Sequence, residues 1–250
     1  MIYFRKQNLI LPLLMLAGIQ PDAQQRGDPK LTEIWSPVPR VVTPGKSAAG
    51  APSDAILLFN TQKDTSNWAG TDGKPFSWKA DKDFFTVVPF SGDLHTRQAF
   101  GDCQLHVEWR TPAEVKDSGQ GRGNSGIFLM SRYELQVMDS YNNLTYSNGQ
   151  AGSIYKQHMP LANVCRPPGE WQSYDIIFTA PHFNPDSTVK SAARITVFQN
   201  GVLVQNNVEL WGPTQFIGVP KYVPHGDKEP LLLQDHHNFV SYRNIWIREL

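Results

Sequence analysis

Polar side chains able to bind or react with a polyhydroxylated ligand recur on three predicted strands, each time opposite an apolar face. They are Glu108 and Arg110, then Glu134 and Gln136, then Gln234 and His236. Because side chains alternate along a strand, the members of each pair lie side by side on one face. Carboxylate, amide, guanidinium and imidazole groups hydrogen-bond hydroxyls, and a groove with a few convergent polar groups is the usual form of a small-ligand site. If the three strands share one layer of a sandwich, their polar faces form one groove.

Other residues extend this candidate groove. Asn124 and Asp139 flank the predicted hairpin that carries Glu134 and Gln136, and both are candidate ligand-binding residues. Aromatic rings at Tyr133, Tyr155 and Trp211 are candidates for stacking on a sugar face.

A structural interpretation competes with the chemical one at several positions. Glu108 and Arg110 fit a surface ion pair, which contributes little to stability. A single histidine on a strand is more often structural than catalytic, and His237 beside His236 leaves the choice between them open. Asp139 has the parity of a core-facing residue at a strand end, where an aspartate can cap a turn.

The positions of apolar residues define the elements that carry these groups. Residues 103–110 alternate strictly, residues 127–130 are apolar on both faces, and residues 133–139 alternate again after a reversal at Ser131 and Arg132. Asn200-Gly201 predicts a type I′ hairpin turn. The predicted core face includes Cys103, Leu105, Val107, Trp109, Leu135 and Val137. About a dozen such strands, with no long helical period, predict an antiparallel sandwich or barrel.

Composition agrees with one all-β domain and excludes some partners. The chain has 250 residues, 40% of them hydrophobic, with 19 Gly and 19 Pro. Lys plus Arg and Asp plus Glu both number 23, so the net charge is zero. That balance argues against an electrostatic nucleic-acid or membrane-surface binder.

The N-terminus predicts export. Arg5 and Lys6 precede an apolar run over residues 9–19, which is too short to span a membrane but typical of a secretory signal peptide. We expect a signal peptide over residues 1–23, an extended arm over residues 24–53 and the domain over residues 54–250. The expected location is the periplasm or the extracellular space. Export permits a disulfide between Cys103 and Cys165, but we expect two free thiols because Cys103 lies on an apolar face.

Three ordered blocks resemble the 3-keto-disaccharide hydrolase domain family, also known as domain of unknown function 1080. They cover residues 100–110, residues 123–140, and residues 233–236 with 242–247. Gly169-Glu-Trp171 and Asn200-Gly-Val202 fall between the blocks in the expected order. The chain departs from the family at His237, where glycine is usual, and at Cys103, where an aromatic residue is common.

The resemblance implies an all-β fold, a concanavalin A-like jelly-roll sandwich of two antiparallel sheets. It also implies an exported bacterial enzyme that cleaves oxidised, 3-keto glycosides. A ketone at C3 acidifies the proton at C2, so a base can remove it, the C1 substituent leaves, and hydration gives net hydrolysis. Such a reaction needs a base near C2 and donors for the enolate oxygen.

Several assignments remain open from the sequence. His236 is the first candidate for the base, with Glu134 orienting it or replacing it as the base. Arg110 or Gln136 is the candidate oxyanion donor. No cofactor is required by the pattern, but a divalent metal held by Glu134, Asp139 and His236 is an alternative to those donors. Rival functions are a conventional glycoside hydrolase with Glu134 and Glu108 as paired carboxylates, and a non-catalytic carbohydrate-binding module.

Overall fold

The computed structural model describes residues 27–250. The chain divides into two compact units, one ending at Val41 and the other comprising Val42–Leu250. In the first, a short 3₁₀ helix η1 (Pro29–Thr32) begins after Asp28, whose carboxylate accepts a hydrogen bond from Lys30 N at 3.0 Å. The expected arm, residues 24–53, is therefore divided between the two units. The predicted signal peptide, residues 1–23, lies outside the described residues.

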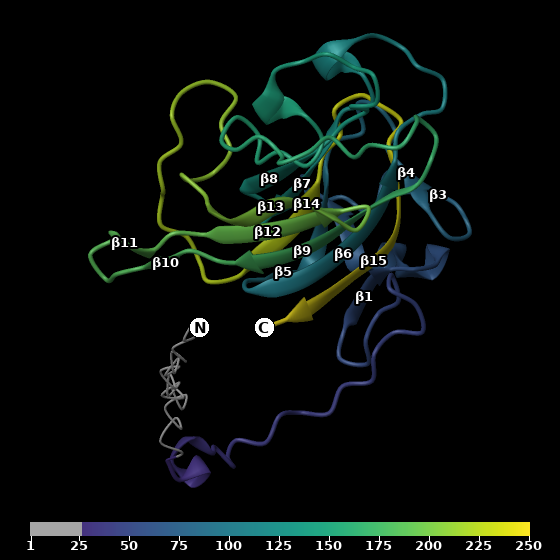
Figure 1. Ribbon diagram of the computed structural model, residues 1–250. Helices are drawn as coiled ribbons and strands as arrows, with labels where there is room; N and C mark the ends of the chain where they lie inside the picture. The colour runs from purple at the N-terminus through teal and green to yellow at the C-terminus, as the bar shows by residue number, and fades with distance from the viewer. Residues whose placement is uncertain (1–26) are drawn as a thin grey trace, which may run out of the picture. The chain divides into compact units, whose positions relative to one another are not determined.

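The second unit is a sandwich of two antiparallel sheets, drawn as arrows in Figure 1. The larger sheet has the strand order β13-β12-β9-β6-β15-β4-β3, and β1 pairs with β15 beside this path. Its strands are β1 (Ile56–Phe59), β3 (Lys79–Ala80), β4 (Phe85–Thr86), β6 (Cys103–Arg110), β9 (Gln172–Thr179), β12 (Arg194–Gln199), β13 (Val202–Glu209) and β15 (Ser241–Glu249).

The smaller sheet has the order β2-β5-β14-β7-β8. Its strands are β2 (Trp68–Gly70), β5 (Leu94–Phe100), β7 (Ser125–Leu129), β8 (Tyr133–Val137) and β14 (Glu229–Leu233). A separate ribbon pairs β10 (His182–Phe183) with β11 (Val189–Ser191). The only helices of the described chain are η1 and three further 3₁₀ helices: η2 (Gln62–Asn67), η3 (Gly119–Gly121) and η4 (Ser147–Gly149). None of the helices within residues 27–250 is long and apolar enough to cross a membrane.

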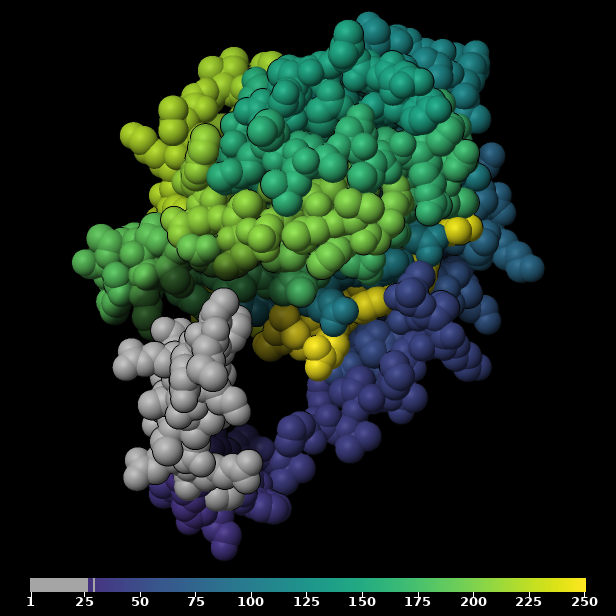
Figure 2. Space-filling view, in the orientation of Figure 1, coloured from purple at the N-terminus to yellow at the C-terminus, as the bar shows by residue number. Residues whose placement is uncertain are grey.

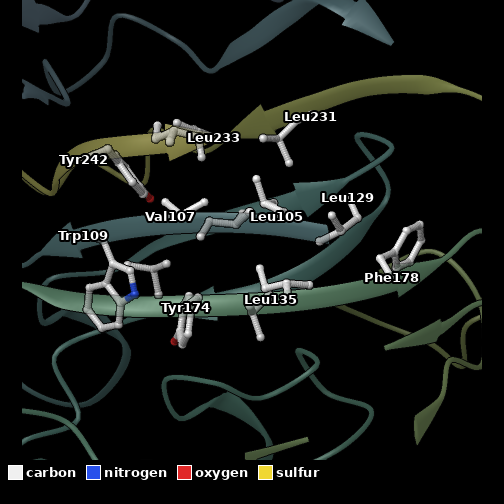
Figure 3. Close-up of a cluster of buried hydrophobic side chains, with 14 of the residues drawn as sticks. Leu105, Val107, Trp109, Leu129, Leu135, Tyr174, Phe178, Leu231, Leu233 and Tyr242 are labelled. Carbon is white, nitrogen blue, oxygen red and sulfur yellow. The ribbon is translucent and has the colours of Figure 1, made fainter. Parts of the chain in front are cut away.

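The two sheets bury the alternating apolar residues between them. In Figure 3, Leu231 and Leu233 of β14 face Leu105 and Val107 of β6. All the residues of the predicted core face are buried, with exposed fractions of 0–1%. The predicted antiparallel sandwich is confirmed, and the fold is a jelly roll. Its stability comes from apolar area removed from water, at about 25 cal/mol per Å².

Two predicted hairpins form. Asn200 and Gly201 have positive φ angles of 53° and 80° between β12 and β13, as a type I′ turn requires. The turn between β7 and β8 lies one residue earlier than predicted, because Met130 (φ 53°) and Ser131 (φ 55°) adopt the left-handed conformation. Both cysteines are free, as expected, with Cys103 buried and Cys165 half-buried.

The segment that precedes β1 packs on the outer face of the larger sheet. Ala49 O accepts hydrogen bonds from Trp246 Nε1 at 3.0 Å and from Asn244 Nδ2 at 2.9 Å. Beside this contact, His106 stacks on Trp246 with ring centroids 5.4 Å apart and is only 1% exposed. Glu108 and Arg110 lie on the face of β6 opposite the core residues, as predicted, and His106 on the same face is buried.

Candidate functional site

A cavity of about 280 Å³ opens on the outer face of the smaller sheet, where β14, β7 and β8 lie side by side. We call it the Glu134 pocket. It is lined by Asn124, Phe128, Glu134, Gln136, Tyr155, Thr214, Phe216, Gln234 and His236. Six of the eleven candidate binding, catalytic and stacking residues named from the sequence therefore meet in one place.

Strand register explains this convergence. Phe128 pairs with Glu134 across the hairpin, and Gly126 pairs with Gln136, so all four face the same side. Gln234 N donates to Gly126 O at 3.0 Å, which continues the pairing just beyond β14. A Cβ atom on Gly126 would lie 2.9 Å from Glu134 Oε1 and 2.6 Å from the Phe128 ring. Glycine is therefore required for the close packing at the floor of the pocket.

Loops cover this outer face of the smaller sheet, and every residue of β8 is buried. Thr214, from the loop after β13, accepts a hydrogen bond from Glu134 N at 2.9 Å, and Thr214 N donates to Arg132 O at 2.8 Å. Lys156 Nζ donates to Phe216 O at 2.6 Å. In Figure 2 the loop that follows β13, yellow-green at the upper left, packs against teal and green segments of the chain. No sequence pattern pointed to Thr214 and Phe216, because their segment has no alternation.

Glu134 is the chemically unusual group of the pocket. Its side chain lies on the floor, and the residue is 5% exposed. Burial disfavours the charged carboxylate and raises the pKa of Glu134 to about 8. A carboxyl group with a pKa near working pH can both take up and release a proton, which is the property of a general base.

Amides surround this carboxyl group. The side-chain amide of Gln136 lies between two oxygens. One end is 3.1 Å from Gln120 Oε1, and the other end is 3.2 Å from Glu134 Oε1. With its nitrogen toward Glu134, it donates to that carboxyl group and to Ser125 O at 2.9 Å. Asn124 Nδ2 donates to Gln120 O at 2.7 Å, and the buried Gln234 Oε1 has no protein partner. These amides can exchange or add hydrogen bonds to a hydroxylated ligand.

The aromatic and imidazole groups stand at the edge of the pocket. Tyr155 OH lies 2.6 Å from Tyr146 OH, and burial raises the pKa of Tyr155, so the phenol stays protonated. His236 is exposed, and it lies beyond β14, which ends at Leu233. Gln234 and His236, which were expected on a strand, therefore lie beyond its end, and His236 belongs to a loop.

Glu108 and Arg110 do not belong to this site, contrary to expectation. Both lie on β6, in the other sheet, on its outer face. Glu108 accepts from Arg243 Nε at 2.6 Å and from Asn244 Nδ2 at 2.8 Å. The Arg110 guanidinium lies 4.6 Å from the centroid of the Trp171 ring. Alternation fixes which side of a strand faces the core, but each sheet has its own outer face.

Asp139 is near the pocket but does not line it. Its carboxylate pairs with Arg122 Nε at 2.6 Å and accepts from Tyr141 N at 3.1 Å, so it caps the end of the hairpin. Glu134, Asp139 and His236 therefore do not form one ligand set. Among the residues that the structure describes, no group of three or more His, Cys, Asp and Glu side chains is placed to hold a metal ion.

The other two proposed stacking residues also lie elsewhere. Tyr133 faces the core, is 1% exposed, and its OH lies 2.7 Å from His225 Nε2. Trp211 is exposed and packs edge-on against His158 outside the pocket. Of the three candidates, only Tyr155 is available to a ligand in the pocket.

The backbone conformation of His237, beside His236, accounts for the glycine that is usual at this position in the related family. His237 has a φ angle of 61°, a conformation that glycine adopts without steric cost. We expect His237→Gly to be more stable than His237→Ala by about 1 kcal/mol, because both lose the contact with Phe90 but only alanine keeps the strain. Urea unfolding of the two variants measures this difference. Equal midpoints would show that the turn carries no strain.

The buried Glu134 also predicts how stability depends on pH. The folded protein holds a proton that the unfolded chain releases above its ordinary pKa of 4.5, so stability is full below that pH and falls as pH rises to about 8. The slope is about 1.4 kcal/mol per pH unit. Glu134→Gln should lack this component. Urea unfolding of both proteins between pH 5 and 9 isolates it by difference, and a pH-independent difference would contradict the raised pKa.

The amide-lined pocket on one outer face of this jelly-roll sandwich can hydrogen-bond the hydroxyls of a sugar. Comparison with protein families agrees. Residues 54–248 match the family described as 3-keto-alpha-glucoside-1,2-lyase-like domain, and the chain belongs to this family.

Solved structures give the same result. A protein from Parabacteroides distasonis ATCC 8503, called a "putative glycosyl hydrolase", is 48% identical over 89% of this chain and 97% of its own, with a TM-score of 0.85. A second such protein from the same organism is 18% identical over 78% and 94%, with a TM-score of 0.57, which shows the fold alone. No curated protein matches the chain. The chain is a carbohydrate-active enzyme.

Proposed function

We propose that this protein cleaves 3-keto glycosides by removing the C2 proton, eliminating the C1 substituent and hydrating the product. The observation that carries the proposal is which acidic and basic side chains line the Glu134 pocket. Among its lining residues in the described chain, Glu134 is the one carboxylate and His236 the one imidazole. A conventional glycosidase needs two carboxylates across the scissile bond. Glu108 lies on the other sheet and Asp139 is tied to Arg122, so neither supplies the second.

The residues of the pocket divide the reaction between them. Glu134, as the carboxylate, takes the proton from C2, and the electron pair of that C–H bond moves into an enolate with its charge on the C3 oxygen. The Gln136 and Gln234 amides donate to that oxygen or hold neighbouring hydroxyls. The enolate then expels the oxygen at C1, and protonated His236 gives this oxygen its proton. Addition of water across the new C1–C2 double bond completes the net hydrolysis.

The decisive experiment offers the purified protein a 3-keto disaccharide and its unoxidised parent, each with and without chelator. We expect product from the keto form alone, because only the ketone acidifies the C2 proton. Cleavage of the unoxidised parent would establish a conventional hydrolase instead. Binding of both sugars without turnover would establish a binding module. Loss of activity with chelator, restored by metal, would add a metal to the site.

We further propose that the protein is exported. The support is the basic start and apolar run at residues 5–19, which lie outside the described residues. Expression in a bacterial host followed by fractionation should give a mature chain that begins near Gln24. A version with Leu13 and Leu14 both changed to Arg should keep its N-terminal segment and stay in the cytoplasm. Recovery of the intact Met1 chain from the cytoplasm of the unmodified strain would contradict export.

A further inference from the structure

A second cavity, of about 460 Å³, has part of its lining in common with the Glu134 pocket. We call it the Arg122 cavity. It is lined by Thr111, Pro112, Glu114, Val115, Lys116, Asp117, Gly121, Arg122, Gly123, Asp139, His236, His237, Asn238 and Phe239. Of these residues, only His236 also lines the Glu134 pocket.

The two cavities adjoin at the ends of the same strands. His236 lines both. Just before β7, Gly123 lines the Arg122 cavity and its neighbour Asn124 lines the Glu134 pocket. Just after β14, Gln234 lines the Glu134 pocket and His237 lines the Arg122 cavity. A ligand longer than one ring can therefore run from one cavity into the other past His236.

The lining of the Arg122 cavity suits an uncharged ring. Arg122 and Asp139 neutralise each other at 2.6 Å, and the charged residues around them are of both signs. Val115 and Phe239 are exposed by 48% and 60%, and they present apolar surface at the cavity. A pyranose ring has an apolar C–H face for such surface and hydroxyls for the polar groups. An anionic leaving group would find no net opposite charge, because the lining has three carboxylates, Glu114, Asp117 and Asp139, against Lys116 and Arg122.

We propose that the Arg122 cavity is the leaving-group subsite, which holds a second pyranose ring of the substrate while the 3-keto ring occupies the Glu134 pocket. The inference rests on the proposed function. It places the scissile bond beside His236, where the cavities meet, and so accounts for the position of the group that protonates the departing oxygen. The enzyme then prefers a disaccharide to a glycoside with a small leaving group.

The test compares kcat/KM for a 3-keto disaccharide with kcat/KM for methyl 3-keto-glucoside. Val115→Trp fills the cavity from an exposed loop, and Val189→Trp adds the same side chain at an exposed position on β11 that lines neither cavity. We expect Val115→Trp to lower the disaccharide-to-methyl ratio about tenfold, the scale of one lost apolar ring contact, and Val189→Trp to leave it unchanged. Phe239→Ala removes apolar surface without adding bulk and should lower the ratio in the same direction.

The outcomes separate the two proposals. An unchanged ratio in both Val115→Trp and Phe239→Ala, in proteins that still cleave the methyl glycoside, would overturn the subsite and leave the proposed function intact. Wild-type protein inactive on both 3-keto substrates would overturn the proposed function itself. If Val115→Trp does not fold, Phe239→Ala alone decides, since its side chain is mostly exposed.

Discussion

Replacing Glu134 with glutamine is expected to lower kcat on a 3-keto glycoside by roughly 10²–10⁴-fold, the usual contribution of a general base. Glutamine has the same shape but cannot accept the C2 proton. The fold should persist, because the carboxyl group is held largely protonated at neutral pH by burial, and a neutral amide suits the same environment. Steady-state kinetics with matched urea unfolding measures both effects.

The pH profile distinguishes a base from a positioning residue. On 4-nitrophenyl 3-keto-glucoside, whose phenolate leaves without a proton, wild-type kcat/KM should rise with pH to a plateau with an apparent pKa near 8, because the active form of Glu134 is the carboxylate. Glu134→Gln should lose this limb, whereas Glu209→Gln, at an exposed ion pair with Arg194, should keep it. Wild-type turnover in Glu134→Gln would remove Glu134 from the chemistry and make His236 the leading candidate for the base.

Replacing His236 with alanine is expected to slow cleavage of a 3-keto disaccharide by roughly 10²–10⁴-fold, because the departing oxygen loses its proton donor. The side chain is exposed on a loop, so its removal costs the core little. His237→Ala should have a much smaller effect, because His237 lines only the Arg122 cavity and stacks on Phe90 at 4.1 Å. Turnover of the two variants is compared at equal folded concentration.

Leaving-group dependence then identifies the role of His236. A 4-nitrophenyl 3-keto-glucoside releases a stable phenolate that needs no proton, so His236→Ala should slow its cleavage by less than about tenfold. Equal losses on both substrates would mean that His236 takes the C2 proton rather than protonating the leaving group. A His236→Ala protein that fails to fold would instead assign the residue a structural role, and His236→Gln would then separate the two effects.

The sequence predicted the fold because alternation is a direct consequence of burying one face of each strand. Leu105, Val107, Leu135 and Val137 were assigned to the core by parity, and all are fully buried. Alternation also placed Glu134 and Gln136 on the opposite face of their strand. In the structure, residues of the neighbouring strands complete a pocket around this carboxyl group and amide.

The rest of the site depended on information that local patterns do not contain. Parity gave Glu108 and Glu134 the same character, but strand order put them in different sheets. The cover of the pocket comes from Thr214 and Phe216, which are about 80 residues from β8 in the chain and lie in a loop without a period. The raised pKa of Glu134 follows from that cover, so it too was invisible in the sequence.

The hydrogen bonds of Ala49 bear on where this domain begins as an evolutionary and a physical unit. The family match begins at residue 54, but the compact unit begins at Val42. A protein trimmed to the matching residues would lose the Ala49 oxygen, which is the acceptor of Trp246 Nε1 and one of the two acceptors of Asn244 Nδ2, and would uncover the aromatic face beside His106. Recombinant production of this domain, and the choice of junctions for fusing it to other modules, should therefore start upstream of Val42, because the shortest recognisable homology unit is not the smallest unit that keeps its polar groups satisfied.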